Sequence, residues 1–239
     1  KAIAVNVSDI GAMGGTPSHC LISLALPEDL EAVWFDEFAN GVGAACRKFE
    51  ISLVGGDTSK AECIFVDVCV VGRIRRDGSV RRSGAQPGDG VYITGTIGGS
   101  GLGLRLLEVG RSDDPAIRRH LYPEPRHRIG HEIAERATAM TDISDGFSTD
   151  LGHIVSESAV SARIEGNRIP LHPGEDLNLA LDSGEEYELI VTARELPPEI
   201  DGVPITRVGE IVESGEAHQI LLDQNSLKRI LEPGGWKHL

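Results

Sequence analysis

The stretch Thr141-Asp-Ile-Ser-Asp-Gly-Phe-Ser-Thr-Asp-Leu-Gly-His-Ile154 gathers three carboxylates around a Ser-Asp-Gly turn. The apolar residues after the turn lie four, seven and eight positions from the first of them, as on one face of an amphipathic helix: Phe147, Leu151, Ile154 and Val155. Ser144 or Asp145 is a natural N-cap, and Gly146 relaxes the backbone at the helix entry. The stretch therefore predicts a turn-and-helix unit around which the chain is organised.

The three carboxylates of this unit are Asp142, Asp145 and Asp150. The positive end of a helix dipole favours ionised carboxylates at the start of the helix. Several ionised carboxylates in one turn are suitable ligands for Mg²⁺, which prefers oxygen. A doubly capped helix with surface aspartates is the alternative, and this stretch by itself leaves both interpretations open.

The composition indicates a globular protein with one large domain or two modest ones, since the chain has 239 residues. A net charge of −14 and an aromatic content of 4% argue against nucleic acid or an anionic membrane as partner. A phosphate ligand remains compatible with this charge, because bound cations can reverse the local sign. No apolar run approaches the roughly 18 residues of a membrane span.

The four cysteines form neither a Cys-x-x-Cys pair nor a zinc spacing, which fits a reducing cytoplasm. No signal peptide is visible, so we predict a cytoplasmic protein. The chain starts at Lys1 without an initiator Met, inside an expected helix over residues 1–14. We therefore expect the chain to lack the beginning of a longer protein.

Two shorter motifs also carry aspartates. Residues 51–54 are expected to form a strand that runs into Gly55-Gly-Asp-Thr-Ser59, so that Asp57 lies beyond the end of a sheet, where α/β proteins usually bind ligands. A plain glycine-rich turn is the alternative. Within the first helix, Val7-Ser8-Asp9 has the same pattern as Ile143-Ser144-Asp145.

Several polar segments are ambiguous when they are considered alone. The arginine pair in the polar loop 81–89 suits an anionic ligand, although such pairs are usually solvated. The acidic segment Ser183–Leu189 precedes a strand and is either a ligand contact or an acidic edge. The four-residue spacing of His127 and His131 is better explained as a coincidence on a helix surface than as a zinc site. Trp236 provides either a stacking surface or a terminal latch.

Taken in order along nearly the whole chain, these motifs resemble the thiamine-monophosphate kinase family, which is built like aminoimidazole ribonucleotide synthetase. The element Gly184-Glu-Glu-Tyr-Glu-Leu189 is similar to the kinase signature and favours the kinases over their synthetase relatives. The other matching segments are Lys1–Gly14, Leu53–Thr58, Arg82–Ala85, Asp142–Gly146 and Asp150–Ile154.

The resemblance implies a two-domain PurM-like α/β (α+β) fold. Residues 1–77 would form a truncated sheet-and-helix domain that binds ATP and metal and dimerises, and residues 78–239 a C-terminal α/β domain. The implied reaction is direct in-line transfer of the γ-phosphoryl group of ATP to thiamine monophosphate, with several Mg²⁺ ions and no covalent catalytic residue. Another ATP-dependent enzyme of this fold, or an inactive nucleotide-binding fragment, is the alternative.

The resemblance also implies roles for individual residues. The family's metal-binding aspartates match Asp9, Asp57, Asp142 and Asp145. Nucleotide contacts match Gly56, Arg82 and Ser144, and substrate contacts match Glu185 and Trp236. Asp150 matches no ligand and is expected to be structural.

The chain departs from the family pattern in three places. The N-terminal Gly-Asp-Asp and Ser-Thr-Asp-Thr motifs, which supply further metal ligands and part of the dimer-forming sheet, are absent from the chain. The signature also carries Ser183 and Glu186 where the family has Gly and Asp. Trp236 stands where Tyr is more usual.

Overall fold

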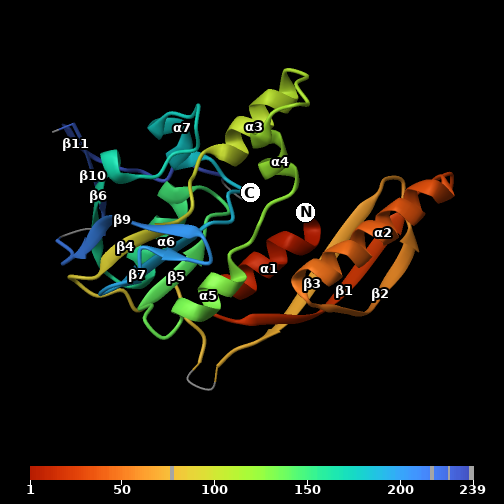
Figure 1. Ribbon diagram of the computed structural model, residues 1–239, viewed down its shortest axis with the longest axis horizontal. Helices are drawn as coiled ribbons and strands as arrows, with labels where there is room; N and C mark the ends of the chain where they lie inside the picture. The colour runs from red at the N-terminus through yellow and green to blue at the C-terminus, as the bar shows by residue number, and fades with distance from the viewer. Residues whose placement is uncertain (76–77, 216–217, 226, 237–239) are drawn as a thin grey trace.

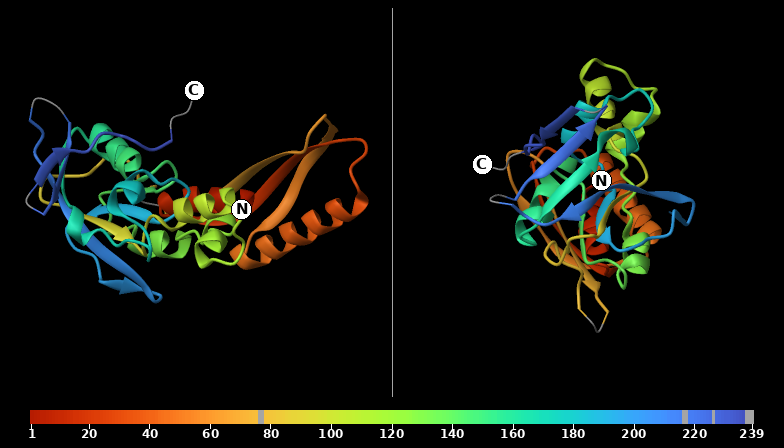
Figure 2. Two further views of the ribbon diagram at one scale, coloured as in Figure 1. Left: turned by 90° about the horizontal axis from the view of Figure 1, so that it is seen from above. Right: turned by 90° about the vertical axis from the view of Figure 1, so that its left-hand side faces the viewer.

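Figure 1 shows the computed structural model of the chain, which describes residues 1–75, 78–215, 218–225 and 227–236. A three-stranded sheet with its helices lies at one end of the molecule, and a larger mixed sheet with its helices lies at the other. Seen from above, the two parts are arranged along the longest axis, which makes the molecule elongated (Figure 2). The predicted domain boundary lies between residues 77 and 78. Residues 76–77 are outside the described residues, so this boundary stays a prediction.

The N-terminal sheet has the strand order β2-β1-β3, with β1 parallel to β2 and antiparallel to β3. Two helices pack on one of its faces. The apolar residues of β1 that face these helices alternate along the strand (Cys20, Ile22 and Leu24), and Val7 and Phe49 meet them from the helices. The bounds are α1 (Ala2–Ala12), β1 (Thr16–Leu26), α2 (Ala32–Phe49), β2 (Ser52–Lys60) and β3 (Phe65–Arg73).

Strand β2 continues through the Gly-Gly-Asp motif, so the expectation that Gly55–Ser59 is a turn beyond the sheet is wrong. Parallel pairing with β1 places Asp57 opposite Ser23 in the middle of the strand. A Cβ atom at Gly56 would overlap the carbonyl oxygen of Ile22, so the glycine permits close approach of the two backbones. Gly56 is therefore needed for this strand pairing, whereas a Cβ at Gly55 would meet only the Leu21 side chain, at 3.6 Å.

The C-terminal sheet has eight strands, with the order β11-β10-β6-β9-β4-β7-β5 and β8 paired to β9. Its strands are mostly antiparallel, and within the described residues only β10 and β6 pair in parallel. The bounds are β4 (Gly90–Thr94), β5 (Ala139–Asp142), β6 (Ser161–Glu165), β7 (Leu189–Ala193), β8 (Glu199–Ile200), β9 (Val203–Val212), β10 (Ile220–Gln224) and β11 (Leu227–Ile230).

Both faces of this sheet are covered. The predicted amphipathic helix is confirmed as α6, whose apolar stripe, including Phe147 and Leu151, packs on one face. On the other face, Ile129 and Ile133 of α5 pack against Leu189 and Val191. The bounds are α3 (Gly99–Glu108), α4 (Pro115–Leu121), α5 (His127–Ile133), α6 (Phe147–Glu157), η1 (Gly166–Arg168) and α7 (Leu177–Asp182). Among the described residues, no helix has the length and apolarity needed to cross a membrane.

Helix α1 connects the two parts of the molecule. Its first half belongs to the core of the small sheet, while Ala12 joins the core under α5. The two helices cross where Gly11 of α1 meets Gly130 of α5, and a Cβ at Gly130 would overlap the carbonyl oxygen of Gly11. His131 donates a hydrogen bond from Nδ1 to the carbonyl oxygen of Gly14 (3.1 Å), so this histidine also serves the junction.

We expect Gly130→Ala to lower the free energy of unfolding by about 1–3 kcal/mol, because the added methyl group forces α1 and α5 apart. Urea unfolding followed by circular dichroism measures the change. The matched control is Gly41→Ala on exposed α2, where a Cβ would meet nothing within 4 Å. That control should be neutral or raise stability by ~0.5–1 kcal/mol. Equal effects at the two positions would show that the helix crossing is not tightly packed.

Candidate functional site

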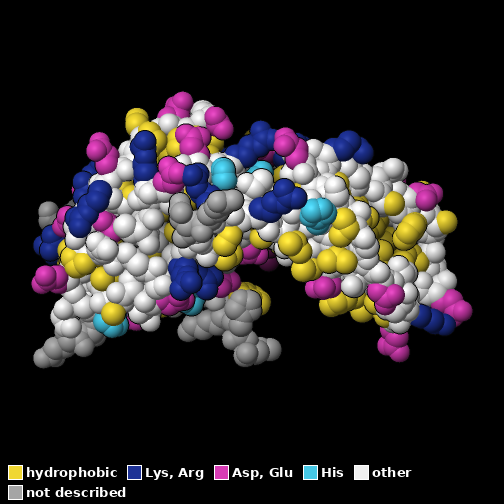
Figure 3. All heavy atoms as spheres, turned by 90° about the horizontal axis from the view of Figure 1, so that it is seen from below, with side chains coloured by type: hydrophobic (Ala, Val, Ile, Leu, Met, Phe, Trp, Pro, Cys, Tyr) yellow, Lys and Arg dark blue, Asp and Glu magenta, His cyan; other side chains and the backbone are white. Residues whose placement is uncertain are grey.

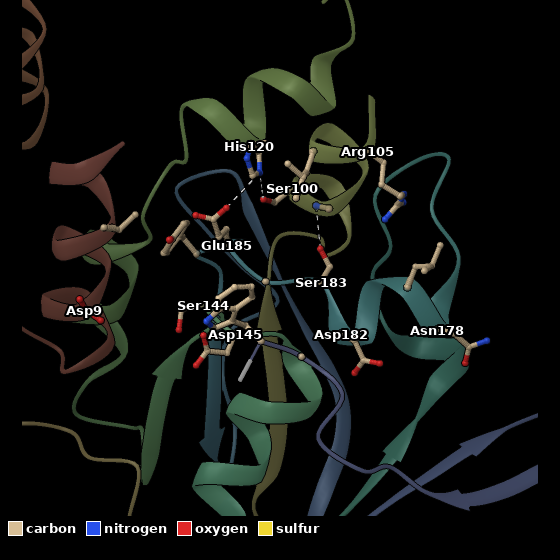
Figure 4. Close-up of a pocket in the computed structure, with 18 of the residues that line it drawn as sticks. Asp9, Ser100, Arg105, His120, Ser144, Asp145, Asn178, Asp182, Ser183 and Glu185 are labelled. Atoms are coloured by element: carbon tan, nitrogen blue, oxygen red, sulfur yellow. Dashed lines mark hydrogen bonds and ion pairs between the residues drawn. The ribbon is translucent and has the colours of Figure 1, made fainter. Parts of the chain in front are cut away.

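A cavity of about 1020 Å³ lies between α1, the paired helices α3 and α4, the turn before α6, and the acidic loop that precedes β7. Figure 4 shows Asp9 on one side, Asp182 and Asn178 on the other, and Ser144, Asp145 and Glu185 between them. Of the nine residues predicted for the site, six line this cavity: Asp9, Arg82, Ser144, Asp145, Glu185 and Trp236. The fold thus brings together residues from the start, the middle and the end of the chain.

Asp142 lies behind the cavity wall, at the end of β5, and is 3% exposed. The Ser8 hydroxyl donates a 2.5 Å hydrogen bond to its Oδ2 atom. Burial and, to a lesser extent, the negative charge of Asp9 raise the pKa of Asp142 to about 6, against the lowering effects of Ser8 and Arg82. Burial raises the pKa of Asp9 as well. Two carboxylates that oppose one another's ionisation favour a bound cation between or beside them.

Asp150 fixes the turn that carries Ser144 and Asp145. Its Oδ2 atom accepts hydrogen bonds from the backbone N–H groups of Ser144 (3.0 Å), Asp145 (3.0 Å) and Gly146 (3.1 Å). The N-cap is Gly146, at φ 120°, and it makes no side-chain cap, so the prediction of Ser144 or Asp145 as N-cap is wrong. The capping carboxylate comes instead from within the helix, which supports the structural role predicted for Asp150.

Successive side chains of the acidic loop point alternately into the cavity and into the protein interior. Glu185 lines the cavity, whereas Glu186 is buried, and its Oε1 atom accepts hydrogen bonds from Gly98 N (2.9 Å), Ser100 N (3.0 Å) and Ser183 Oγ (3.0 Å). These bonds tie the loop to the N-terminus of α3. Burial raises the pKa of Glu186, against the Arg119 charge and these hydrogen bonds.

Glu188 forms the second buried anchor of the same loop. Arg126 binds it through two bonds, Nε to Oε2 (2.8 Å) and Nη2 to Oε1 (2.7 Å), and Thr94 Oγ1 donates to it at 2.7 Å. With Glu186 and Glu188 directed inward, the backbone at Glu185 and Tyr187 adopts positive φ angles of 59° and 54°. The loop is therefore held in a conformation that residues other than glycine seldom adopt.

His120 and Ser100 are functional-site residues that the sequence did not reveal. His120 Nδ1 lies 3.0 Å from Ser100 Oγ and 3.6 Å from Glu185 Oε2, and all three residues line the cavity (Figure 4). Burial, with the charge of Lys1, lowers the pKa of His120. Helices α3 and α4 bring these side chains together, and no motif in the sequence marks them.

The segment before Trp236 is attached to the turn that starts α6. Gly234 N donates to Ser148 Oγ (3.1 Å), Gly235 N to Thr149 Oγ1 (3.2 Å), and Trp236 N to the carbonyl oxygen of Asp145 (2.9 Å). A Cβ at Gly235 would overlap that same carbonyl, so only glycine lets the chain lie this close. The indole is 66% exposed and contributes to the cavity wall.

Asp57 and Gly56 are the predicted site residues that the fold keeps away from this cavity. Both lie in β2, whose residues are all exposed, on the small sheet. Their metal and nucleotide roles stay predictions.

Comparison with known proteins identifies relatives over the whole chain. Residues 1–74 match the family AIR synthase related protein, N-terminal domain, and residues 86–219 match AIR synthase related protein, C-terminal domain. The chain is 38% identical to thiamine-monophosphate kinase of Aquifex aeolicus, covering 100% of this chain and 79% of that protein.

Solved structures agree with these matches. AaThiL complexed with AMPPCP and TMP is 37% identical with a TM-score of 0.87, covering 100% of this chain and 79% of that one. Hydrogenase maturation protein HypE in complex with ATP, at 19% identity, a TM-score of 0.81 and coverage of 100% and 79%, shares the fold alone. The expected two-domain α/β fold is confirmed.

We expect Asp142→Asn to change the pH dependence of stability in the metal-free protein. The folded-state pKa of about 6 exceeds the value of 3.8 for an unburied aspartate, so the folded chain binds this proton more tightly than the unfolded chain. The contribution of this proton to the free energy of unfolding is therefore fully present below about pH 4. It is lost as the pH rises through 6, which lowers the free energy of unfolding by up to about 3 kcal/mol. The asparagine removes this loss and keeps an oxygen for Ser8.

Urea unfolding in EDTA from about pH 4 to pH 8 measures the difference between variant and parent. The variant should be the more stable protein at the upper end and comparable at the lower end. Asp113→Asn, at a side chain that is 78% exposed, is the control and should leave the profile unchanged. Parallel profiles for Asp142→Asn and the parent would contradict the shifted pKa.

Proposed function

The chain belongs to the thiamine-monophosphate kinase family of AIR synthase-related proteins, and we propose that its cavity transfers the γ-phosphoryl group of ATP directly to the phosphate of thiamine monophosphate. The family resemblance predicted from the motifs is confirmed. The observation that carries the proposal is the joining, in one cavity, of a carboxylate-rich wall around Asp9 and Asp145 with a wall that contains Glu185 and Trp236. The first suits a metal-bound phosphate chain and the second an organic cation.

Arg82 and Ser144 suit the phosphates of the nucleotide. Arg82 Nε donates to Thr141 Oγ1 at 3.3 Å, which orients the guanidinium while its terminal N–H groups remain available to phosphate oxygens. The backbone of Ser144 is fixed by Asp150, so its hydroxyl is carried by a rigid turn. Both residues line the cavity beside Asp145.

The carboxylates Asp9, Asp142 and Asp145 fit a magnesium site. They offer oxygen ligands only, as Mg²⁺ requires, and the raised pKa values of Asp9 and Asp142 reflect burial of charge that a cation would offset. Magnesium bound there supplies charge neutralisation to the phosphates that react. The residues themselves hold this position through the Ser8 bond to Asp142 and the Asp150 bonds to the turn.

Glu185 and Trp236 suit the thiamine part of the acceptor. A thiazolium ring is a flat cation, which an indole face and a carboxylate both attract. The pyrimidine amino group adds N–H donors, for which Glu185 offers acceptor oxygens. The two residues lie on the same cavity, and the carbonyl of Asp145 holds the backbone of Trp236.

Direct transfer is also favoured over a covalent intermediate on Ser100. In a serine–histidine–acid relay, the nucleophile and the acid contact opposite ring nitrogens. Here Ser100 and Glu185 both approach Nδ1 of His120, so the acid cannot orient the ring toward the serine. Ser100 is moreover 1% exposed. The arrangement fits a polar recognition wall better than a nucleophilic site.

A homodimer formed by the small sheet is the further part of the proposal. The sheet face opposite α1 and α2 carries large apolar side chains that are 41–60% exposed: Leu21, Phe65 and Val71. Figure 3 shows hydrophobic side chains gathered over this half of the molecule. Monomeric proteins rarely expose such a face. Pairing of two copies here would place Asp57, which lies in the row opposite Ser23, at the interface.

We expect the protein to convert thiamine monophosphate and Mg·ATP into thiamine diphosphate and ADP, and Asp145→Asn to lower kcat on the order of 10²-fold or more by removing charge that holds the metal. Product is quantified by chromatography and folding by thermal unfolding. Asp36→Asn on exposed α2 is the control and should retain activity. The same ADP assay is then run with a panel of other acceptors. If one of them gives ADP while thiamine monophosphate gives no thiamine diphosphate, the chain is a different enzyme of this fold.

We expect the parent protein to have twice the chain mass of 25.6 kDa in solution, and Leu21→Lys with Val71→Lys to shift it to the monomer. The two charges would be buried without partners in an apolar interface. Light scattering coupled to gel filtration gives the masses. Val109→Lys, at a residue 74% exposed beyond α3, should leave the dimer intact. A monomeric parent protein at micromolar concentration would remove the basis for this proposal.

A further inference from the structure

We propose that Asp145, Asp150 and His153 form a second cation site, behind the cavity, for a divalent transition-metal ion such as Zn²⁺ or Mn²⁺. One ligand atom from each of the three residues lies within 4.8 Å of the others. His153 is half-buried and does not line the cavity. The site shares Asp145 with the magnesium position of the proposed function, and its other two ligands, Asp150 and His153, have no part in that position.

A second, independent observation is the unsatisfied oxygen Oδ1 of Asp150. Asp150 is 1% exposed, and its Oδ2 atom already accepts three backbone N–H groups. Its Oδ1 atom is buried and has no hydrogen-bond partner among the described residues. A buried carboxyl oxygen without a partner is costly. A cation would satisfy it.

The charges around Asp150 favour a cation over a neutral donor. Its neighbours Asp142 and Asp145 are carboxylates as well, so this part of the fold concentrates negative charge. The remaining ligand, His153, adds an imidazole nitrogen, a common metal ligand in proteins. A positive ion therefore gains from all three side chains.

The three ligands are held in place before any ion binds. Asp150 and His153 are three residues apart on α6, so they share one face of the helix. The backbone of Asp145 is fixed on both sides, since its N–H binds Asp150 Oδ2 and its carbonyl accepts from Trp236 N (2.9 Å). A site assembled on such a rigid turn loses little entropy on binding.

The ligand set indicates which ion binds. Two carboxylates and one imidazole suit Zn²⁺, Mn²⁺ or Co²⁺, whereas Mg²⁺ prefers oxygen ligands alone. Because Asp145 also lines the cavity, an ion at this site would restrain that side chain from behind. We infer a positioning role for the ion, through Asp145, and no role in contact with substrate.

Calorimetric titration of the EDTA-treated protein with Zn²⁺, in excess Mg²⁺ to occupy oxygen-only sites, tests the proposal. We expect one Zn²⁺ per chain, and His153→Gln to weaken it by about 10- to 100-fold. His218→Gln, at an exposed histidine outside the cluster, is the matched control and should bind as the parent does. Thermal unfolding without metal checks that the variants are folded.

Anomalous diffraction from crystals soaked in Zn²⁺ gives a second readout that needs no variant. A peak between Asp145, Asp150 and His153 would support the site. Unchanged Zn²⁺ affinity in His153→Gln, or an ordinary water at Oδ1 of Asp150 in the soaked crystal, would overturn it. Both measurements report binding, so they stand apart from any result on kinase turnover.

Discussion

The hydrogen bond from Ser8 to Asp142 is the constraint on which the arrangement of the site depends. Ser8 belongs to the helix that fills the core of the small sheet, and Asp142 ends a strand of the large one. The bond is buried, so breaking it would leave an uncompensated carboxylate in the interior. It sets Asp9, the next residue of α1, against the turn that carries Ser144 and Asp145. The cavity is thus located at the junction of the two halves, and it exists only while that junction is closed.

On the proposed function, the same junction accounts for the binding of phosphates by an acidic chain. Asp9, Asp142, Asp145 and Asp150 are concentrated around one turn, with Arg82 as the positive charge that acts on Asp9 and Asp142. Without cations this concentration of charge opposes folding near neutral pH. With cations, the carboxylates become a scaffold that presents positive charge to anionic substrates. Metal bound there as proposed would therefore be coupled in free energy to closure of the two halves.

Local patterns in the sequence predicted the local parts of this structure and missed those that depend on distant contacts. The periodicity of Phe147, Leu151 and Ile154 predicted α6 because burial of one helical face leaves a regular trace in the sequence. Gly55–Ser59 resembles a turn because glycines are typical of turns, and only pairing with β1 makes it a strand. The sequence predicts the N-cap of α6 at Ser144 or Asp145, just before the helix, whereas the capping oxygen belongs to Asp150 within the helix. His120 reaches the cavity through the packing of α3 and α4, and such packing leaves no motif.

At Glu185, the left-handed backbone lowers the stability of the fold, while the side chain supplies a carboxylate to the cavity. A side chain there costs on the order of 1 kcal/mol relative to glycine, which adopts this conformation freely. Natural selection for stability alone would replace the glutamate with glycine or asparagine. The buried anchors that follow it, Glu186 and Glu188, hold the loop so firmly that the strained residue is tolerated. Programmes that search for stabilising substitutions would therefore select against the carboxylate that faces the cavity, and this position should be left out of any such library.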